Sequence, residues 1–356
     1  MYNKNMRKRL AAILIVVLLL FSGCTRTKRY FSYTVYPVGY LLNRIAGDRI
    51  ETISVQSNQI VQAANPVDNF EEILDDSAYF FHIGDLEPYY DIYEKTITES
   101  EAEIVDLSSL NAIYKFERYT LVYVDGKESF IESPYYNDPS FDNIDTNEHD
   151  LLLWIDPIGM LSMAKDIYSL LASNYVEFAS SFEENYKKLE SELISLDAAY
   201  QNLATKLKKE NVSLKFVTMS ASFGNWQKAY GFQVYPVCLS KYGALPSEHQ
   251  LEIIKTRIKA DDVRYIVFEP NMTDAMVTLF EQLESELGLK RIYLSNISSL
   301  SASQMSDNKD YFSLMYENLS VLDNIANIMI ESKSESITEN NSEETTANES
   351  DIAAEE

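Results

Sequence analysis

The stretch 182–207, FEENYKKLESELISLDAAYQNLATKL, decides the fold of this 356-residue chain. Its apolar side chains recur at alternating intervals of four and three residues, at Phe182, Tyr186, Leu189, Leu193, Leu196, Tyr200, Leu203 and Leu207. That spacing predicts one apolar stripe on a single long helix over residues 174–210. The same repeat is typical of a coiled coil. We favour a helix that packs on two lobes, because strand and helix patterns alternate on both sides of it.

The segments before and after this helix read as alternating strands and helices. Residues 30–55 predict a strand, a helix that starts at Pro37 and ends near Gly47, and a second strand. Beyond the long helix, strand-like segments alternate with helix-like ones: 214–219, 223–231, 232–237, 247–259, 263–270, 272–287, 290–295 and 308–330. Such alternation is typical of parallel sheets covered by helices. The predicted fold class is α/β, with two doubly wound lobes, 30–173 and 211–330, and a cleft between them.

Two segments depart from this alternation. Residues 112–148 predict a hairpin around Asp125-Gly126 and then an acidic loop, and we place this insertion on the N-terminal lobe. Its tyrosines either form a contact surface, since tyrosine is favoured at interfaces, or pack the hairpin itself: Tyr114, Tyr119, Tyr123, Tyr135 and Tyr136. Residues 331–356 hold nine acids, one lysine and few apolar residues, which predicts a disordered acidic tail.

The charge balance excludes one class of partner. The chain carries 55 Asp and Glu residues against 30 Lys and Arg, whereas a nucleic-acid-binding face needs clustered basic side chains. We therefore expect no nucleic-acid partner. Apolar residues make up 46% of the chain, which is enough for sizeable cores.

The N-terminus has the pattern of an export signal. A basic segment precedes an apolar run of 12 residues, 10–21, that is too short to span a bilayer as an ordinary helix. The segment FSGC then ends at Cys24 and resembles the bacterial lipobox. We expect a signal peptide over 1–23, a lipid on Cys24, a tether over 24–29 and a body on the outer face of the cytoplasmic membrane; a plain secretory signal is the alternative. The second cysteine, Cys238, lies in an apolar segment and is expected to be buried.

Six further segments together resemble a known family. They are TVYPVGYLLNRIAGDRI at 34–50, FFHIGDLEPYYD at 80–91, LLLWIDPIGMLSMAKDI at 151–167, SASFGNWQKAYGFQV at 220–234, LPSEHQLEIIKTRIKADDVRYIVFEP at 245–270 and LGLKRIYLS at 287–295. In this order, around one long helix and after a lipobox, they resemble the substrate-binding lipoproteins of zinc- and manganese-type ABC importers. The resemblance implies an ABC permease as partner. Motifs for a catalytic serine, a phosphate loop or a zinc protease do not occur, so we expect no enzyme and no cofactor.

The resemblance also implies four metal ligands, three of them His and the fourth Asp, Glu or His. At those positions this chain has Val67, Leu152, Ser220 and Ser295. Zinc and manganese are bound by imidazole, thiolate or carboxylate groups, and none of these four side chains provides one. The segment 149–157, HDLLLWIDP, therefore keeps the pattern of a metal-site strand without its ligand.

Three histidines remain as possible ligands: His82, His149 and His249. His82 lies within a strand pattern and is expected in the core, while His249 stands at a helix start on the surface. Alternation along an extended strand puts His149 on the side opposite the lost ligand, beside the acidic loop. A shifted metal site would combine His149 with Asp68 and Glu269, and this alternative stays open.

Neutral hydrogen-bonding groups dominate the predicted cleft, whose walls we expect to include Asn69, Trp154, Ser220, Asn225, Ser295 and Asn296. They suit a small polar organic ligand or a complexed metal. Ser220 and Ser222 are expected to cap a helix that starts near Phe223. The sequence thus predicts a lipid-anchored solute-binding protein with a degenerate metal site. The alternatives are a metal receptor with the shifted site, and an interaction or adhesion lipoprotein that has lost its cargo.

Overall fold

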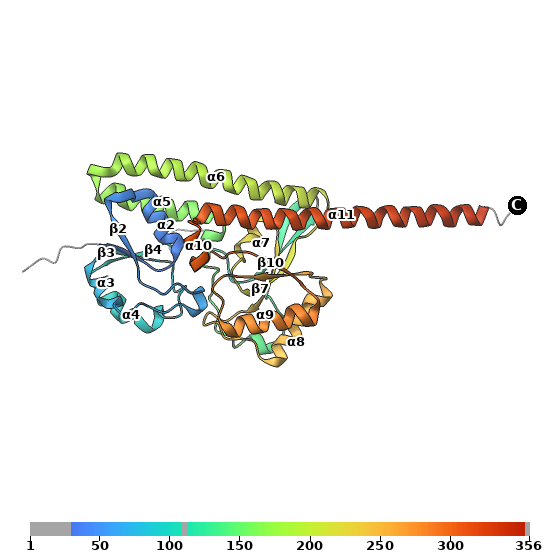
Figure 1. The fold of residues 1–356 in the computed structure, drawn as a ribbon, viewed down its shortest axis with the longest axis horizontal. Helices are drawn as coiled ribbons and strands as arrows, with labels where there is room; N and C mark the ends of the chain where they lie inside the picture. The colour runs from blue at the N-terminus through green and yellow to red at the C-terminus, as the bar shows by residue number, and fades with distance from the viewer. Residues whose placement is uncertain (1–29, 109–112, 353–356) are drawn as a thin grey trace, which may run out of the picture.

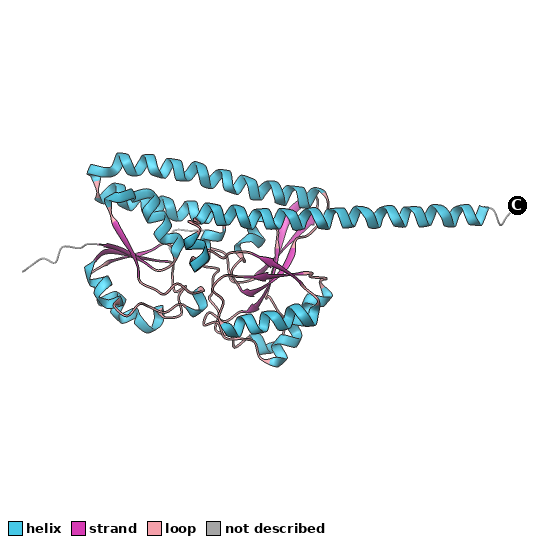
Figure 2. Ribbon diagram, viewed as in Figure 1, coloured by secondary structure: helices cyan, strands magenta, loops and turns pink. Residues whose placement is uncertain are grey.

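Two lobes lie side by side in the computed structural model, which describes residues 30–108 and 113–352 (Figure 1). Each lobe has its own sheet, and the helix α6 (Ala179–Lys209) runs along both (Figure 2). The predicted α/β class with two lobes and one long helix is therefore confirmed.

The N-terminal lobe is built on a parallel sheet of order β2-β1-β3-β4. Its strands and helices are β1 (Tyr30–Tyr33), α2 (Tyr36–Ala46), β2 (Glu51–Ser54), α3 (Phe70–Asp76), β3 (Ser77–His82), α4 (Tyr90–Glu99) and β4 (Glu103–Asp106). The helix α2 has Pro37 in its first turn, where the missing N–H costs no hydrogen bond. It ends at Gly47, whose φ of 58° is open to glycine.

The C-terminal lobe is built on a second parallel sheet, of order β10-β9-β7-β8. Its elements are β7 (Lys215–Ser220), α7 (Asn225–Tyr230), β8 (Gln233–Cys238), α8 (Glu248–Ala260), β9 (Tyr265–Phe268), α9 (Asp274–Leu287), β10 (Lys290–Tyr293) and α10 (Ala302–Ser306). Every residue of β8 is buried, because helices and the hairpin cover the sheet. Cys238 is 1% exposed, and burial raises the pKa of its thiol to about 12, as expected for an inert core cysteine.

The helix α6 buries the whole predicted stripe. All eight apolar positions from Phe182 to Leu207 are buried, and the helix packs against α2, α11 (Tyr311–Ile352) and α5 (Pro157–Asn174). Phe31 of the N-terminal sheet and Phe216 of the C-terminal sheet belong to the same apolar core as the stripe. The helix is therefore a spine for both lobes and not one strand of a coiled coil.

The insertion forms the predicted hairpin but lies on the other lobe. Strands β5 (Arg118–Val124) and β6 (Lys127–Ser133) pair antiparallel around Asp125 and Gly126, both with positive φ. Buried Arg118 donates from Nη2 to the hydroxyl of Tyr235 at 2.9 Å, and its guanidinium lies 4.6 Å from that ring. These contacts hold the hairpin on the C-terminal sheet. Our assignment to the N-terminal lobe, made from sequence order alone, is wrong.

Most tyrosines of the insertion serve packing. Tyr119, Tyr135 and Tyr136 are each less than a tenth exposed, and Tyr136 donates its hydroxyl to the carbonyl of Pro236 at 2.8 Å. Tyr123, at 53% exposure, is the exception near the hairpin tip. A contact surface made of all five tyrosines is thus not formed.

The C-terminal helix continues beyond the lobes (Figure 1). Helix α11 extends to Ile352 and includes most of the segment 331–356 that composition predicts to be disordered. Low apolar content limits core formation, but a lone helix satisfies its own backbone without burying apolar surface. Short 3₁₀ turns complete the fold: Gly47–Arg49, Val61–Ala63, Pro139–Phe141, Leu153–Ile155 and Val176–Phe178. No described helix is long and apolar enough to cross a bilayer, and Cys24 lies outside the described residues.

Candidate functional site

Three polar residues meet at the carboxyl ends of neighbouring strands in the C-terminal sheet. Ser220 is the last residue of β7, Glu269 directly follows β9, and Asn296 comes shortly after β10. Carboxyl ends of parallel strands share one edge, which is where open α/β sheets place their ligand sites. Ser220 and Asn296, both predicted for the cleft, are thus brought together.

Glu269 is the centre of this group and is completely buried. Its carboxylate accepts from the amide of Ser220 at 3.1 Å, from the hydroxyl of Ser220 at 2.8 Å and from Nδ2 of Asn296 at 2.9 Å. Burial raises the pKa of Glu269, while these hydrogen bonds oppose the rise. Neutral donors therefore satisfy a carboxylate that the shifted-site hypothesis would give to a metal ion.

Ser222 also joins the Glu269 network. Its hydroxyl bonds to that of Ser220, and it contributes a hydrogen bond to Glu269. The following helix, α7, has Gly224 at its N-cap without a side-chain cap. The predicted capping role of the two serines is therefore wrong, because the buried carboxylate competes for their hydroxyls.

Trp154 contacts this network through the backbone of Asn296. It is fully buried, and its Nε1 donates to the carbonyl of Asn296 at 2.7 Å. Its own carbonyl accepts from the hydroxyl of Tyr311 at 2.7 Å. Trp154 is consequently a core residue that joins α11 to the Asn296 loop, and not the cleft wall that we predicted.

The segment 149–157 is a loop, not a strand. His149 forms a single antiparallel bridge with Lys115, and a 3₁₀ turn over Leu153–Ile155 leads into α5. Asn225 holds the loop by donating Nδ2 to the carbonyl of Leu152 at 3.1 Å. Because the chain is not extended here, side-chain alternation does not apply, and His149 and Leu152 line the same cavity. Our placement of them on opposite sides is wrong.

Asp150 is a buried acid that the sequence reading overlooked. Its Oδ1 accepts from the amide of Leu152 at 3.2 Å, and burial raises the pKa of its carboxyl to about 7. The backbone of Gly224 approaches so closely that a Cβ there would lie 2.1 Å from Asp150 Oδ2. The glycine in the ASFG segment is therefore required by Asp150. The sequence did contain a signal for this buried acid, because Asp150 directly precedes three leucines.

We expect the contribution of Asp150 to the free energy of unfolding to fall as the pH rises from about 4 to about 7. In this interval the folded protein keeps the proton of Asp150, with its pKa of about 7, while the unfolded chain has released it near 3.8. The native state thus binds more protons than the unfolded state. The stabilisation that results from this difference is lost as the pH rises. Glu87, whose pKa burial also raises to about 7, adds to the slope.

Urea unfolding of Asp150→Asn at several pH values measures this contribution. Between about pH 4 and about pH 7, the free energy of unfolding of the variant should fall less steeply than that of the wild type, because the other acids with raised pKa values, Glu87, Asp156 and Glu269, remain in both proteins. Asp142→Asn, at an exposed acid of the insertion 112–148, should leave the slope unchanged. An identical slope in Asp150→Asn would contradict the assignment.

The remaining predicted wall residues do not face a common space. The amide of Ser295 donates to Oδ1 of Asn318 at 2.8 Å, so this residue is tied to α11. Asn69 is exposed at the N-cap of α3. Asn225 anchors the 150–152 loop, as described above. We grouped these residues by their order in the sequence. Sequence order does not determine the direction in which each side chain points in the folded protein.

The placements of His82 and His249 are as expected, whereas the shifted metal site around His149 is not formed. His82 is 4% exposed and bonds through Nδ1 to the carbonyl of Gly84 at 2.8 Å, and His249 is exposed at the start of α8. The shifted site fails on placement: Asp68 is exposed on the N-terminal lobe, and Glu269 is enclosed by its own donors. Within residues 30–108 and 113–352, no three His, Cys, Asp or Glu side chains are grouped to hold a metal ion.

The cleft between the lobes is nearly filled. A cavity of about 20 Å³ remains, with Val61 and Leu86 of the N-terminal lobe, Leu152 of the loop, and Ala221 and Cys238 of the C-terminal lobe among its walls. A space of that size holds about one water molecule.

Several polar atoms nevertheless reach this cavity. Gln62 Oε1 and Asn147 Oδ1 are buried and have no hydrogen-bond partner among the described residues. His149, Asp150 and Lys241 lie on the same walls. A buried acceptor without a partner costs about 1–3 kcal/mol, so a molecule with hydrogen-bond donors would be stabilised here.

Two α/β lobes with a long helix and an interlobe cleft define the class of two-lobed solute-binding proteins. The sequence model of one family of this class, described as ZnuA, zinc-uptake complex component A, periplasmic, matches residues 32–325. The chain belongs to this family, as the sequence resemblance predicts. Members of the family are solute-binding proteins and not enzymes.

Curated relatives match about half of this chain. The zinc-binding lipoprotein AdcA of Streptococcus pneumoniae strain R6 is 27% identical over 176 residues, which are 49% of this chain and 34% of that protein. The high-affinity zinc uptake system protein ZnuA of Bacillus subtilis is 26% identical over 170 residues, 48% of this chain and 51% of that protein. The chain therefore spans about a third to a half of the relatives' length.

Solved structures share the fold over most of the chain. The periplasmic zinc-binding protein TroA from Treponema pallidum has a TM-score of 0.64 at 16% identity, covering 84% of this chain and 99% of that one. Zn(II)-bound AdcA from Streptococcus pneumoniae has a TM-score of 0.61 at 20% identity, covering 83% and 57%. At these identities the likeness establishes the fold alone.

Proposed function

We propose that the chain is the extracytoplasmic solute-binding component of a metal-type ABC importer, and that its cleft accepts a non-metal ligand or a complexed metal in place of a free ion. The carrying observation is the Glu269 network. Ser220, at a position where the family resemblance implies a metal ligand, gives its amide and its hydroxyl to Glu269. The carboxylate of Glu269 is thereby committed to neutral protein donors, and burial raises the pKa of Asp150, the carboxyl on the cavity wall, to about 7, which favours its neutral form.

The unpaired acceptors of the cleft favour a small polar ligand. Gln62 Oε1 and Asn147 Oδ1 are neutral, so they would bind N–H or O–H donors more readily than they would dehydrate a divalent ion. The cavity of about 20 Å³ requires the lobes to part before such a ligand enters. Contacts that would break include the bond from the amide of Tyr36 to the carbonyl of Ser298 at 3.0 Å.

Native mass spectrometry of the purified protein, before and after gentle unfolding, tests this proposal. We expect an organic or metal-complex adduct that is released on unfolding and is weakened by Asn147→Leu. The matched control is Asn143→Leu, at an exposed asparagine of the same loop. A bare zinc or manganese adduct would contradict the proposal. No adduct at all would favour the second candidate, an interaction lipoprotein without cargo, for which the exposed hairpin-tip residue Tyr123 is the supporting observation.

Lipid anchoring at Cys24 is part of the proposal and leads to a separate prediction. The basic segment, the 12-residue apolar run and the FSGC segment support cleavage before Cys24 and attachment of a lipid to its thiol. Cys24→Ala should move the protein from the membrane fraction to the soluble fraction, or leave it uncleaved. Cell fractionation with immunoblotting measures both outcomes. Correct cleavage with unchanged membrane retention would contradict lipidation at this residue.

The importer's permease is the proposed partner. Family membership and the two-lobed fold support this assignment. Co-purification of a permease and its ATPase with the membrane-extracted protein is the expected result.

A further inference from the structure

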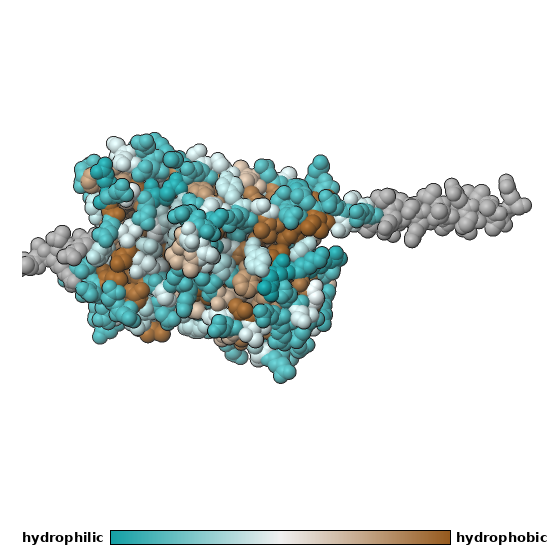
Figure 3. Space-filling model, in the orientation of Figure 1, coloured by the Kyte–Doolittle hydropathy of each residue, from teal (hydrophilic) through white to brown (hydrophobic). Residues whose placement is uncertain are grey.

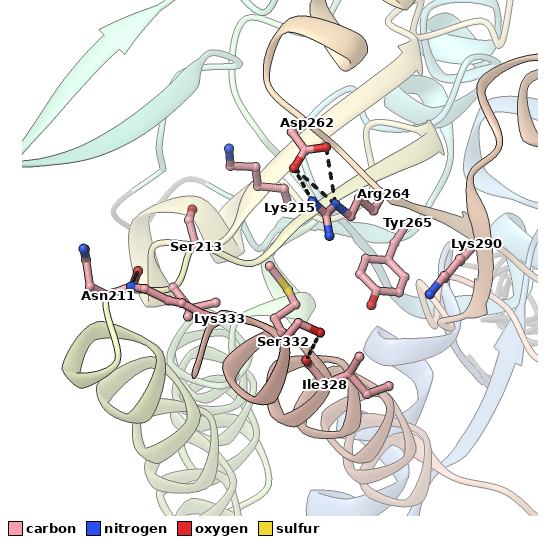
Figure 4. Close-up of a pocket in the computed structure, with 12 residues that line it drawn as sticks. Asn211, Ser213, Lys215, Asp262, Arg264, Tyr265, Lys290, Ile328, Ser332 and Lys333 are labelled. Atoms are coloured by element: carbon pink, nitrogen blue, oxygen red, sulfur yellow. Dashed lines mark hydrogen bonds and ion pairs between the residues drawn. The ribbon is translucent and has the colours of Figure 1, made fainter. Parts of the chain in front are cut away.

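A second cavity lies at the opposite edge of the C-terminal sheet from Glu269. It is an open cavity with a volume of about 600 Å³, lined by residues at the starts of the strands on one side and by α11 on the other (Figure 4). The volume falls in the range of about 300–1,000 Å³ that is usual for small-molecule sites. This cavity is separate from the interlobe cleft, because the two share no lining residue.

Three basic residues lie in a row across this edge of the sheet. Lys215 begins β7, Arg264 directly precedes β9, and Lys290 begins β10. The strands β7, β9 and β10 are neighbours, and the amide of Lys290 donates to the carbonyl of Arg264 at 2.8 Å. Because adjacent strands are about 4.8 Å apart, the register places three basic residues side by side along this edge, with Lys215 and Lys290 on either side of Arg264 (Figure 4).

Few carboxylates neutralise these cations. Asp262, which is ion-paired with Arg264 at 2.8 Å, is the one acid among the described residues that line the cavity. Lys215 donates from Nζ to a backbone carbonyl, that of Asp261 at 2.8 Å, and no described carboxylate lies within 4.0 Å of Lys290. Among the described residues that line the cavity, these three cations stand against one acid, in a chain whose net charge is −25. Its local field therefore attracts anions that the rest of the surface repels.

The opposite wall of the cavity is apolar. Ile328 and Met329 of α11 and Val212 after α6 line it, and Ile328 is 42% exposed. Figure 3 shows hydrophobic side chains gathered along α11 where this helix crosses the C-terminal lobe. A ligand with an apolar body would cover this surface, at a gain of about 25 cal/mol for each Å² removed from water.

We propose that this cavity binds an organic phosphate, with the phosphate against Lys215, Arg264 and Lys290 and the apolar body against Val212, Ile328 and Met329. Lysine acts as a point charge, and two lysines beside an arginine that already has one acid partner suit a dianion better than a monoanion. The phosphate can belong to a soluble ester or to a lipid headgroup. The proposal is independent of the ligand in the cleft.

Calorimetric titration of the purified protein with phenyl phosphate tests the proposal. We expect saturable one-to-one binding that is tighter than that of inorganic phosphate or phenol, and that weakens as salt rises from about 0.05 to about 0.2 M. Lys290→Glu should weaken binding at least about tenfold, since it replaces an attraction by a repulsion. Lys290→Gln, a milder change at an exposed residue, should have a smaller effect in the same direction. Lys188→Glu, the same charge reversal on the exposed face of α6, should change the affinity less than about twofold.

Vesicle sedimentation distinguishes the two sources of phosphate. Binding to phosphatidylglycerol vesicles that is competed by phenyl phosphate and reduced by Lys290→Glu would assign a lipid headgroup, whereas binding of phenyl phosphate without vesicle binding would assign a soluble ester. Phosphatidylcholine vesicles serve as the reference. Absence of saturable phenyl phosphate binding, or equal affinity in wild type, Lys290→Glu and Lys188→Glu, would overturn the proposal.

Discussion

Leu193→Ala is expected to lower the free energy of unfolding by about 2–5 kcal/mol, the usual cost of truncating a fully buried leucine. Leu193 is 0% exposed on α6, in the core that contains Phe31 of one sheet and Phe216 of the other. Truncation removes apolar contact from that shared core and leaves a cavity that the surrounding helices fill only partly. Both lobes should therefore lose stability together, in a single unfolding transition.

Ile194→Ala is the matched control for this prediction. Ile194 is the next residue on the same helix but is 52% exposed, so its truncation should cost less than about 1 kcal/mol. Urea unfolding followed by circular dichroism measures both variants. Equal losses, or a loss below about 1 kcal/mol for Leu193→Ala, would mean that the stripe is not buried as described.

Glu269→Ala is expected to cost about 2–5 kcal/mol, because it leaves buried donors without an acceptor. The amide of Ser220 and Nδ2 of Asn296 both point at the Glu269 carboxylate, and neither residue is more than 4% exposed. Each orphaned donor costs about 1–3 kcal/mol, and water cannot replace the acceptor without opening the lobe.

Glu269→Gln separates this effect from loss of volume. It keeps one carbonyl acceptor and the side-chain shape, so it should cost less than Glu269→Ala. Glu281→Ala, at an exposed acid of α9, should stay within about 0.5 kcal/mol of the wild type. Chemical denaturation at constant pH compares the three. A Glu269→Ala protein as stable as Glu281→Ala would show that the network contributes nothing to folding.

The fold was predictable where periodicity or turn chemistry is local. The stripe on α6 follows from spacing alone, and both parallel sheets follow from the alternation of strand and helix patterns. The hairpin follows from Asp125-Gly126. The lobe that carries this hairpin was not predictable, because it depends on Arg118 reaching Tyr235 across 117 positions of sequence.

The site was predictable only in part. The positions of Ser220 and Asn296 at strand ends were within reach of sequence reading, and the structure joins them through Glu269. Trp154 and Ser295 were misplaced because their direction depends on α11, which is distant in sequence. The position of His149 was misjudged because alternation was applied to a loop.

The acidic tail is instructive for a different reason. Composition describes whether a segment can build a core, and 331–356 cannot. It does not describe local helix formation, for which glutamate is favourable. The extension of α11 to Ile352 therefore differs from the expected disorder. The composition of the segment is as counted, but it does not exclude a helix.

The central claim is that this member of a zinc-uptake family does not bind a free ion in its cleft. Val67 and Leu152 provide no metal donor, and Ser220 is bonded to Glu269. Calorimetric titration of the purified protein with zinc and with manganese tests this claim most directly. The account predicts no one-to-one binding of either ion with a dissociation constant below about 1 μM. Stoichiometric binding tighter than about 1 μM by either ion would contradict it.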